Sequence, residues 1–315
     1  MSKLVISTSS FDTAHNPAIQ KLIKAGMEIV GNPHKRKLTE AEVTGLLGTN
    51  TIGMIAGVEP LTRNVLAAAT SMKVISRCGA GMDTVDLAAA AERDITVSNT
   101  PEAPAQSVAE LTIGLILSAL RRVQQTDRLL RKGEWPRLQG QLLAAQTVGI
   151  IGLGHIGKRV ARLCQAFEAR VIACDPGLTP QNLSSLPAEL VSLDTLLAES
   201  DIITLHLPYS KESHHLLDSH AFEHMRPGVI VINAARGGLI DEVALCQALT
   251  DGKIGVAALD VFENEPYNGP LLACDNIILT SHIGSLAKES RLRMDIEAAE
   301  TLLRGLIKAG LRKDE

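Results

Sequence analysis

Short runs of aliphatic and β-branched residues alternate with longer amphipathic stretches along almost the whole chain of 315 residues. This alternation is typical of βαβ units, in which parallel strands are covered by crossover helices. No short-period repeat or low-complexity tract is visible, which excludes solenoids and propellers. The length exceeds that of one ordinary domain and suits two. We therefore expect an α/β protein with two Rossmann-like domains, each built on a doubly wound parallel sheet.

Two series of candidate strands follow one another along the chain. The first series is expected at Leu4–Ser7, Glu28–Val30, Ile52–Ala56, Val74–Ser76 and Ile95–Ser98. The second series is expected at Thr147–Ile151, Val171–Cys174, Ile202–Leu205, Val229–Ile232, Gly255–Ala258 and Asn276–Leu279. Between the two series, the proline-containing segment Asn99–Ser107 predicts a loop, and the pattern from Val108 to Lys132 predicts one long helix. A final amphipathic helix is expected over Lys288–Leu311.

Composition removes several classes of protein. Hydrophobic residues make up 45% and charged residues 21%, close to globular averages, and this composition is not that of a disordered or collagen-like chain. A net charge of −4 without a basic block, and only 1 Trp, 2 Tyr and 4 Phe, disfavour nucleic-acid binding. The apolar run Leu111–Leu120 is shorter than the roughly 20 residues of a membrane-spanning helix.

The start of the chain and its cysteines indicate a compartment. The first residues, MSKLVIST, contain no apolar run of signal-peptide length. Five scattered cysteines form no CxxC pair and no metal-ligand spacing. We expect a cytoplasmic protein with no structural disulfide and no bound metal.

A glycine-rich loop follows the candidate strand Thr147–Ile151. Gly152, Gly154 and Gly157 form the pattern G-x-G-x-x-G and lead into the helical stretch Lys158–Phe167. This strand-turn-helix context is the one that dinucleotide binding requires, because the backbone must approach the pyrophosphate and the helix N-terminus must face it. A plain packing turn is the alternative interpretation.

An acidic residue stands where the ribose of such a nucleotide would lie. Asp175 is 18 residues beyond Gly157, at the end of the next candidate strand. A carboxylate there accepts hydrogen bonds from the ribose hydroxyls and repels a 2′-phosphate. The sequence therefore predicts NAD rather than NADP as cofactor.

Charged residues also follow the later strands. Arg236 ends a strand within Asn233–Gly238, and its planar guanidinium suits a carboxylate with an adjacent carbonyl oxygen. A salt bridge to Asp241 or Glu242 is the alternative role for Arg236. Strand ends are where ligands bind in such sheets.

One histidine has the same position at a strand end. His282 follows a candidate strand and precedes Ile283 and Gly284, and Asp260, Glu263 and Glu265 follow the neighbouring strand. A carboxylate that orients an imidazole is a common device for general acid/base catalysis near neutral pH. Taken alone, a histidine at a strand end is more often a structural hydrogen-bonding residue, and only the combination with the carboxylates and Arg236 favours catalysis.

Together these segments resemble the D-isomer-specific 2-hydroxyacid dehydrogenase family, and most of all its short phosphoglycerate-dehydrogenase-like members. The resemblance covers nearly the whole chain. The segments that carry it are Cys78–Gly81 with Asp83 and Asp86, Asn99-Thr-Pro, Ser107–Leu111, Gly133-Glu-Trp135, Gly152–Gly157, Asn233–Gly238, Ala258–Phe262 with Glu265-Pro266, and His282-Ile-Gly.

The resemblance implies a role for each matching residue. Arg236 would bind the substrate carboxylate, Glu265 would hold the imidazole, and His282 would be the acid/base on the C2 oxygen. Hydride would pass between C2 and the nicotinamide of NAD, in a cleft that closes around hinges at Asn99–Lys132 and Ser281–Ser285. The cofactor residues implied are Ser107, Gly152, Gly154, His155, Ile156, Gly157, Asp175, Leu207, Pro208, Ala234, Asp260 and Gly284.

The same resemblance implies an interrupted architecture. Residues 1–100 and 287–315 would form the substrate domain, and residues 101–286 would form the NAD-binding domain. The backbone at Ala80 and Gly81 would hold the substrate carboxylate. We expect no regulatory domain after residue 315.

The sequence does not decide which 2-hydroxy acid is the substrate. Arg77 and Arg137 could hold the phosphate of 3-phosphoglycerate, although Arg77 could also be a surface charge. The segment Ala56–Glu59 is apolar and then acidic, so glyoxylate, hydroxypyruvate or another small 2-keto acid is nearly as well supported. Two other functions remain as alternatives: an NADH-binding co-repressor module that acts through peptides, and a phosphite dehydrogenase.

We also expect a homodimer. The run Leu111–Leu120 is more apolar than one buried helix stripe requires, so the predicted helix from Val108 to Lys132 would carry much of the interface.

Overall fold

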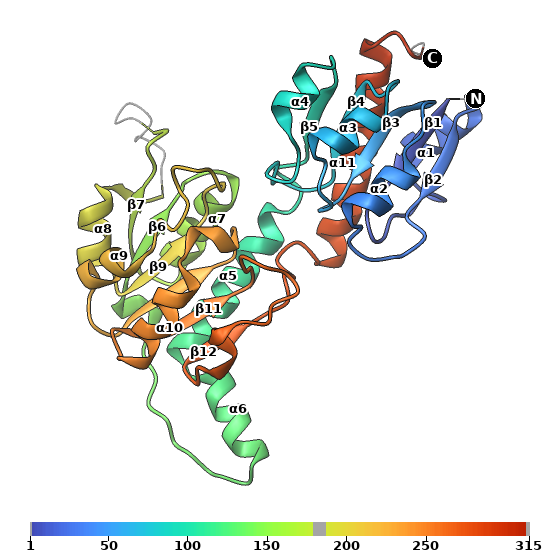
Figure 1. Cartoon of the computed structure of the whole chain (residues 1–315). Coiled ribbons are helices and arrows are strands. Elements are labelled where there is room, and N and C mark those ends of the chain that lie inside the picture. Colours follow the sequence, from blue (N-terminus) through green and yellow to red (C-terminus); the bar gives the residue numbers. More distant parts are fainter. Residues whose placement is uncertain (1, 179–186, 313–315) are drawn as a thin grey trace. The chain divides into compact units, whose positions relative to one another are not determined.

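The computed structural model describes residues 2–178 and 187–312. They form two compact units, one of residues 1–104 and 286–315 and one of residues 105–285 (Figure 1). Each unit contains a parallel sheet with helices on both faces, and the prediction of two α/β domains is confirmed. In the described part of the chain, no helix combines the length and the apolar character that crossing a bilayer requires.

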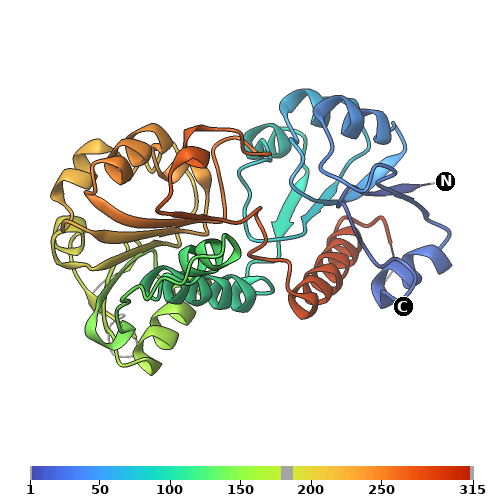
Figure 2. The same cartoon turned by 90° about the horizontal axis from the view of Figure 1, so that it is seen from below.

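The first unit has a five-stranded sheet in the order β2-β1-β3-β4-β5. The strands are β1 (Lys3–Ile6), β2 (Glu28–Gly31), β3 (Thr51–Ala56), β4 (Val74–Arg77) and β5 (Thr96–Asn99). The helices are α1 (Pro17–Lys24), α2 (Glu40–Leu46), α3 (Arg63–Ala68), α4 (Leu87–Ala91) and α11 (Lys288–Lys308). The long helix α11 returns to this unit from the end of the chain and packs along its sheet (Figure 2).

Strand alternation builds two cores on this sheet. Val5, Met54 and Ile75 face the layer of α2, α3 and α4, whereas neighbouring residues such as Leu4 and Val74 face α1 and α11. Because successive side chains of a strand point to opposite faces, runs that are apolar at every position are buried on both sides.

The second unit has a seven-stranded sheet in the order β12-β11-β10-β9-β6-β7-β8. Its strands are β6 (Thr147–Ile151), β7 (Arg170–Cys174), β8 (Glu189–Leu190), β9 (Ile202–Leu205), β10 (Val229–Asn233), β11 (Ile254–Leu259) and β12 (Ile277–Leu279). Helices α5 (Ala105–Leu120) and α7 (His155–Ala166) cover one face. Helices α8 (Leu193–Glu199), α9 (Ser219–His224) and α10 (Glu242–Thr250) cover the other. The strand order reverses between β6 and β9, and such a reversal is where ligands bind in open α/β sheets.

The single helix predicted from Val108 to Lys132 is wrong. The helical stretch breaks after Leu120, and a second helix, α6 (Val123–Arg131), follows Arg122, whose φ of 52° is left-handed. The Leu120 carbonyl accepts a hydrogen bond from the Gln141 N–H at 3.0 Å, so a later segment takes a partner that a longer helix would use. Figure 1 shows α6 and the segment after it projecting from the sheet of this unit.

The apolar run within that stretch is also used differently from the expectation. Ile113, Leu115, Ile116 and Leu120 are buried in the core of their own unit. A single chain therefore buries most of this run in its own core, and the run gives no reason to expect a dimer. The segment after it, by contrast, carries the exposed apolar side chains Val123, Leu130, Trp135 and Leu142.

Candidate active site

A single row of paired residues crosses the sheet of the second unit at the carboxyl ends of its strands. Strand pairing aligns Cys174, Ile151, Leu205, Asn233, Leu259 and Leu279. Each of these residues is followed within three positions by residues predicted from the sequence to bind cofactor or to catalyse. The register therefore brings Asp175, the glycine loop, Arg236 and His282 to one edge of one sheet.

The glycine loop fits closely against its surroundings at two positions and is open at a third. A Cβ on Gly157 would lie 2.0 Å from the Gly152 carbonyl oxygen. A Cβ on Gly152, whose φ is +96°, would lie 2.7 Å from the His206 carbonyl carbon. No heavy atom lies within 4 Å of a Cβ built on Gly154. The loop therefore leaves open space beside Gly154, at the start of the twelve-residue helix α7.

Asp175 is tied to this loop by hydrogen bonds. Its Oδ2 accepts from the Leu153 N–H at 2.7 Å, and its Oδ1 accepts from the Gly177 N–H at 2.8 Å. A carboxylate has about four acceptor positions, so these bonds leave capacity for ribose hydroxyls. The spacing of Asp175 from the loop could be predicted, but its bond to Leu153 could not.

These features fit the nucleotide that the sequence predicts. Open space beside Gly154 and the α7 N-terminus can hold a pyrophosphate, because the N–H groups of a helix N-terminus attract anions. The half-buried Asp175 carboxylate stands at the end of the adjacent strand, where a ribose would lie. His155 is exposed and Ile156 half-buried in the first turn of α7.

The turn after β9 lies directly against the glycine loop. His206 is buried, its Nε2 is 2.9 Å from the Thr204 hydroxyl, and its Nδ1 has no hydrogen-bond partner within the described residues. Burial lowers the pKa of His206 to about 3, so its ring is neutral at physiological pH. Leu207 is half-buried and Pro208 exposed, and both follow this fixed position.

Arg236 extends from a turn that packs on the loop carrying Glu265. A Cβ on Gly237 would lie 1.9 Å from the Phe262 carbonyl carbon, so the two segments touch through their backbones. Asn233 shapes the turn by donating to the Arg236 carbonyl at 2.8 Å, and the Arg236 guanidinium donates to the Ala235 carbonyl at 2.6 Å. Ala234 is buried at the start of this turn, and Arg236 is half-buried.

The two carboxylates proposed as alternative partners of Arg236 have other hydrogen bonds. Asp241 caps α10 by accepting from the Val243 and Ala244 N–H groups at 3.0 Å. Glu242 accepts from the Glu263 N–H at 2.8 Å. Both carboxylates thus hold the backbone of this part of the unit.

His282 and Glu265 form a direct pair. His282 Nδ1 lies 2.8 Å from Glu265 Oε2 and 3.0 Å from Oε1. The two side chains are 38% and 30% exposed, so solutes can reach them. Glu265 also accepts from the Phe262 N–H at 3.2 Å. With Nδ1 held by the carboxylate, Nε2 is the ring nitrogen that can exchange a proton with a substrate.

Asp260 holds the turn on which His282 lies. It is 1% exposed, and its carboxylate accepts from the Thr280 hydroxyl at 2.6 Å, the Ile283 N–H at 2.8 Å and the Gly284 N–H at 2.8 Å. Its carbonyl accepts from the His282 N–H at 2.8 Å. His282 has a left-handed φ of 55°, which these bonds stabilise. Sequence reasoning assigned Asp260 to the cofactor and missed this positioning role.

Ser107 lies near the same turn. It is buried in the first turn of α5, next to Val108, whose Cγ2 would lie 3.3 Å from a Cβ on the buried Gly284. The beginning of α5 therefore packs against the turn that carries His282.

The predicted substrate residues of the first unit lie at the end of β4 and in the loop that follows it. Arg77 is buried, and its guanidinium donates to the Cys78 carbonyl at 2.7 Å. Gly79 has a φ of +131°, and a Cβ there would lie 1.7 Å from Arg77 Nη1. Ala80 and Gly81 are half-buried, and the Ala80 carbonyl accepts from Asn99 Nδ2 at 2.6 Å. The alternative that Arg77 is a surface charge is wrong, because its guanidinium lies under the loop backbone.

Comparison with known proteins defines the class. Residues 113–284 match the family model described as D-isomer specific 2-hydroxyacid dehydrogenase, NAD binding domain. This chain belongs to that family, and the matched domain supports NAD as its cofactor.

Particular relatives include a D-3-phosphoglycerate dehydrogenase of Archaeoglobus fulgidus, 43% identical over 76% of this chain and 46% of that protein. A hydroxypyruvate reductase of Thermotoga maritima is 40% identical over 80% of this chain and 84% of the relative. The crystal structure of a glyoxylate reductase from Paecilomyes thermophila superposes with a TM-score of 0.86, at 30% identity and with 98% and 96% of the two chains covered. The chain spans about half the length of the first of these relatives.

Proposed function

We propose that this chain is an NAD-dependent D-2-hydroxyacid dehydrogenase that interconverts a 2-hydroxy acid and its 2-keto acid. The observation that carries the proposal is the His282–Glu265 pair, which lies at the same sheet edge as the glycine loop and Asp175. A general acid/base and a nucleotide cradle at one edge are what a dehydrogenase needs.

The proton in this reaction is handled by His282. When the keto acid is reduced, the protonated ring gives the proton on Nε2 to the C2 oxygen, which becomes a hydroxyl. Glu265 accepts the hydrogen bond from Nδ1–H and so fixes the ring orientation and supports its positive charge. When the hydroxy acid is oxidised, neutral His282 takes the same proton back.

Arg236 binds the other polar groups of the substrate. Its guanidinium can pair with the C1 carboxylate and donate to the C2 oxygen, which polarises the carbonyl. NAD, when bound, supplies the hydride acceptor for the hydroxy acid and, when reduced, the hydride donor for the keto acid. Ser107, Ala234, Leu207 and Pro208 would line this cofactor, with Gly284 beside them.

The two units would divide the work. We assign substrate binding to residues 1–100 with 287–315, where the backbone of Ala80 and Gly81 would hold a carboxylate. We assign nucleotide binding to residues 101–286. Asn99–Lys132 and Ser281–Ser285, where the chain passes from one unit to the other, would act as hinges when the protein closes around its substrate.

The substrate is proposed as 3-phosphoglycerate or a small acid such as glycerate or glycolate. Arg77 lies beneath the 77–81 loop and Arg137 is exposed, so each could contribute charge to a phosphate. Glu59 favours the small acids, because its buried carboxylate accepts from the Gly57 N–H at 3.0 Å and places negative charge at the end of β3.

We also propose a homodimer that uses α6 and the segment after it. None of the α6 side chains is buried, and the exposed apolar side chains here are Val123, Leu130, Trp135 and Leu142. Exposed apolar surface of this kind is typical of a protein interface.

A substrate panel tests the function. The full chain would be assayed for NADH oxidation with glyoxylate, hydroxypyruvate and pyruvate, and for NAD reduction with 3-phosphoglycerate, phosphite and formate. We expect turnover with at least one 2-keto acid or D-2-hydroxy acid and none with formate. Turnover of phosphite alone would assign a phosphite dehydrogenase. Tight NADH binding without any turnover would assign the co-repressor class.

A further inference from the structure

Two cysteines that are 28 positions apart in the sequence meet in the second unit. Cys246 Sγ, on α10, lies 3.5 Å from Cys274 Sγ, which follows the short helix η4 (Pro270–Ala273). Both residues are half-buried, and both thiols are free. Cys78 and Cys164, by contrast, are buried, and Cys174 is half-buried on β7.

The distance is short enough for a bond to form with little movement. A disulfide has an S–S length of about 2.05 Å, so the sulfurs must approach by about 1.5 Å. Leu272 and Ala273, directly before Cys274, are exposed, whereas Leu271 is buried, so the shift would be confined to the residues next to Cys274. Cys246 sits within a regular helix and stays fixed.

We propose that Cys246 and Cys274 form a reversible disulfide, a redox modification site that responds to small-molecule disulfides. The reaction is thiol–disulfide exchange. The Cys246 thiolate attacks one sulfur of a low-molecular-weight disulfide such as oxidised glutathione, and the first glutathione thiolate leaves. Cys274 then loses its proton to water and attacks Cys246 Sγ, which releases the second glutathione. Two protein thiols are oxidised while one small disulfide is reduced to two thiols.

The order of attack follows from the environment of Cys274. Burial, followed by the hydrogen bond with Cys246, raises the pKa of the Cys274 thiol to about 11. Cys274 therefore serves as the resolving thiol, and Cys246 is the thiol that attacks the oxidant first.

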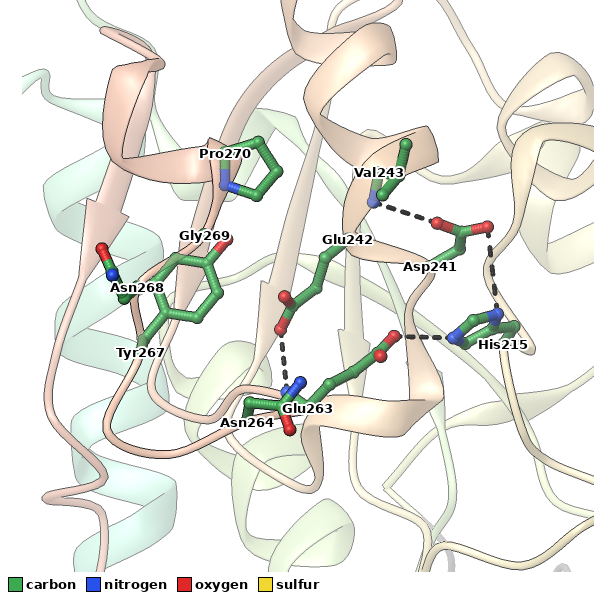
Figure 3. Close-up of a pocket in the computed structure, with 10 residues that line it drawn as sticks. All are labelled: His215, Asp241, Glu242, Val243, Glu263, Asn264, Tyr267, Asn268, Gly269 and Pro270. Atoms are coloured by element: carbon green, nitrogen blue, oxygen red, sulfur yellow. Dashed lines mark hydrogen bonds and ion pairs between the residues drawn. The ribbon is translucent and has the colours of Figure 1, made fainter.

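The proposed bond would fasten a segment that supports Glu265. The Leu271 N–H in η4 donates to the Tyr267 hydroxyl at 3.2 Å, and the Tyr267 ring stacks on Phe262 at 4.3 Å between centroids. Tyr267 and Pro270 line a pocket with Glu242 on α10, drawn in Figure 3. Cys246 Sγ lies 3.9 Å from the Pro270 carbonyl oxygen at the margin of this pocket.

The test uses the full chain, equilibrated with graded ratios of oxidised to reduced glutathione, then acid-quenched, alkylated and mapped by mass spectrometry. We expect a peptide linking Cys246 to Cys274 that increases with the ratio and disappears after treatment with dithiothreitol. In Cys274→Ser, a glutathione adduct should accumulate on Cys246, and Cys174→Ser, the matched half-buried control, should behave as wild type. A wild-type protein that ends with glutathione on Cys246 and no link would overturn the proposal.

A second probe needs no oxidant. Phenylarsine oxide binds two neighbouring thiols together, so wild type and Cys174→Ser should each take up one equivalent. Cys246→Ser and Cys274→Ser should bind it at least about tenfold more weakly, because the second contact is lost. Equal binding by all four proteins would show that the two thiols do not act as a pair.

Discussion

The Asp175 carboxylate holds two backbone segments at once. Its oxygens accept from backbone N–H groups on both the glycine loop and the segment after β7. The same carboxylate is proposed to accept from the ribose hydroxyls. Replacing it therefore changes both the loop and the nucleotide preference, and a matched pair of variants is needed to separate the two effects.

We expect Asp175→Ser to raise the KM for NAD by about tenfold or more, the equivalent of a lost charge-assisted hydrogen bond, and to relax the preference for NAD over NADP. Asp175→Asn should keep an acceptor for the Leu153 N–H while losing the charge, so it should relax the preference with less damage to KM. Steady-state kinetics with both cofactors measures this. An unchanged preference in both variants would remove Asp175 from the ribose site.

Individual residues show where sequence reasoning succeeds and where it stops. Asp175, Arg236 and His282 could be predicted as functional residues. Asp175 has the expected spacing from Gly157, all three follow strand ends, and the strand ends of a parallel sheet share one edge. The clamp that Asp260 makes on the His282 turn was not predictable. It depends on hydrogen bonds between segments 20 to 24 positions apart, which no local pattern encodes.

The glycine loop and α7 act together as one structural element. Gly157 allows the first turn of α7 to approach the Gly152 carbonyl, and Gly152 allows the loop to approach His206. Gly154, with φ of −70°, adopts backbone angles open to any residue and has no neighbour within 4 Å of a Cβ. Packing thus explains Gly157 and Gly152, whereas no packing contact explains Gly154, which we propose faces the pyrophosphate of NAD.

Two alanine variants separate packing from binding. Gly157→Ala should destabilise the protein by about 1–3 kcal/mol, because its Cβ overlaps the Gly152 carbonyl. Gly154→Ala should change stability by less than about 0.5 kcal/mol while weakening NAD binding by about tenfold or more. Denaturant unfolding and calorimetric titration with NAD measure the two effects. Full NAD affinity in a stable Gly154→Ala protein would contradict the cradle.

Helices were harder to predict than strands. The central strands were predicted to within about a residue, because buried parallel strands are continuous aliphatic runs. The two-residue strand β8 was missed, since Glu189 and Leu190 carry no such signal. The break between α5 and α6 was missed because it depends on Gln141, 21 positions after Leu120, reaching the Leu120 carbonyl.

The organisation of the two units could be anticipated only in part. Their α/β class follows from the alternation of strands and helices, and the structure places α11 in the first unit. The apolar run of α5 lies inside the core of its own unit, so it does not support the predicted dimer interface. The exposed apolar residues of α6 provide a different and testable reason to expect a partner surface.

Light scattering tests that surface. We expect the wild-type protein to have twice the mass of one chain, and Leu130→Asp to shift it toward the single-chain mass, because Leu130 is 49% exposed on α6. Val243→Asp is the control, since Val243 is 72% exposed on α10 and outside this surface. A monomeric wild type would refute the dimer. A dimeric Leu130→Asp protein would show that the interface lies elsewhere.

We propose that His282, held by Glu265, transfers the proton of a 2-hydroxyacid dehydrogenase reaction. The most direct measurement compares kcat for NADH-dependent reduction of the preferred 2-keto acid between wild type and His282→Ala, with NADH affinity measured on both proteins. We expect kcat to fall by about 10²–10⁴, the range for a lost general acid/base, while NADH affinity stays within a few-fold. A wild-type kcat in His282→Ala would contradict the account and make His282 a structural residue.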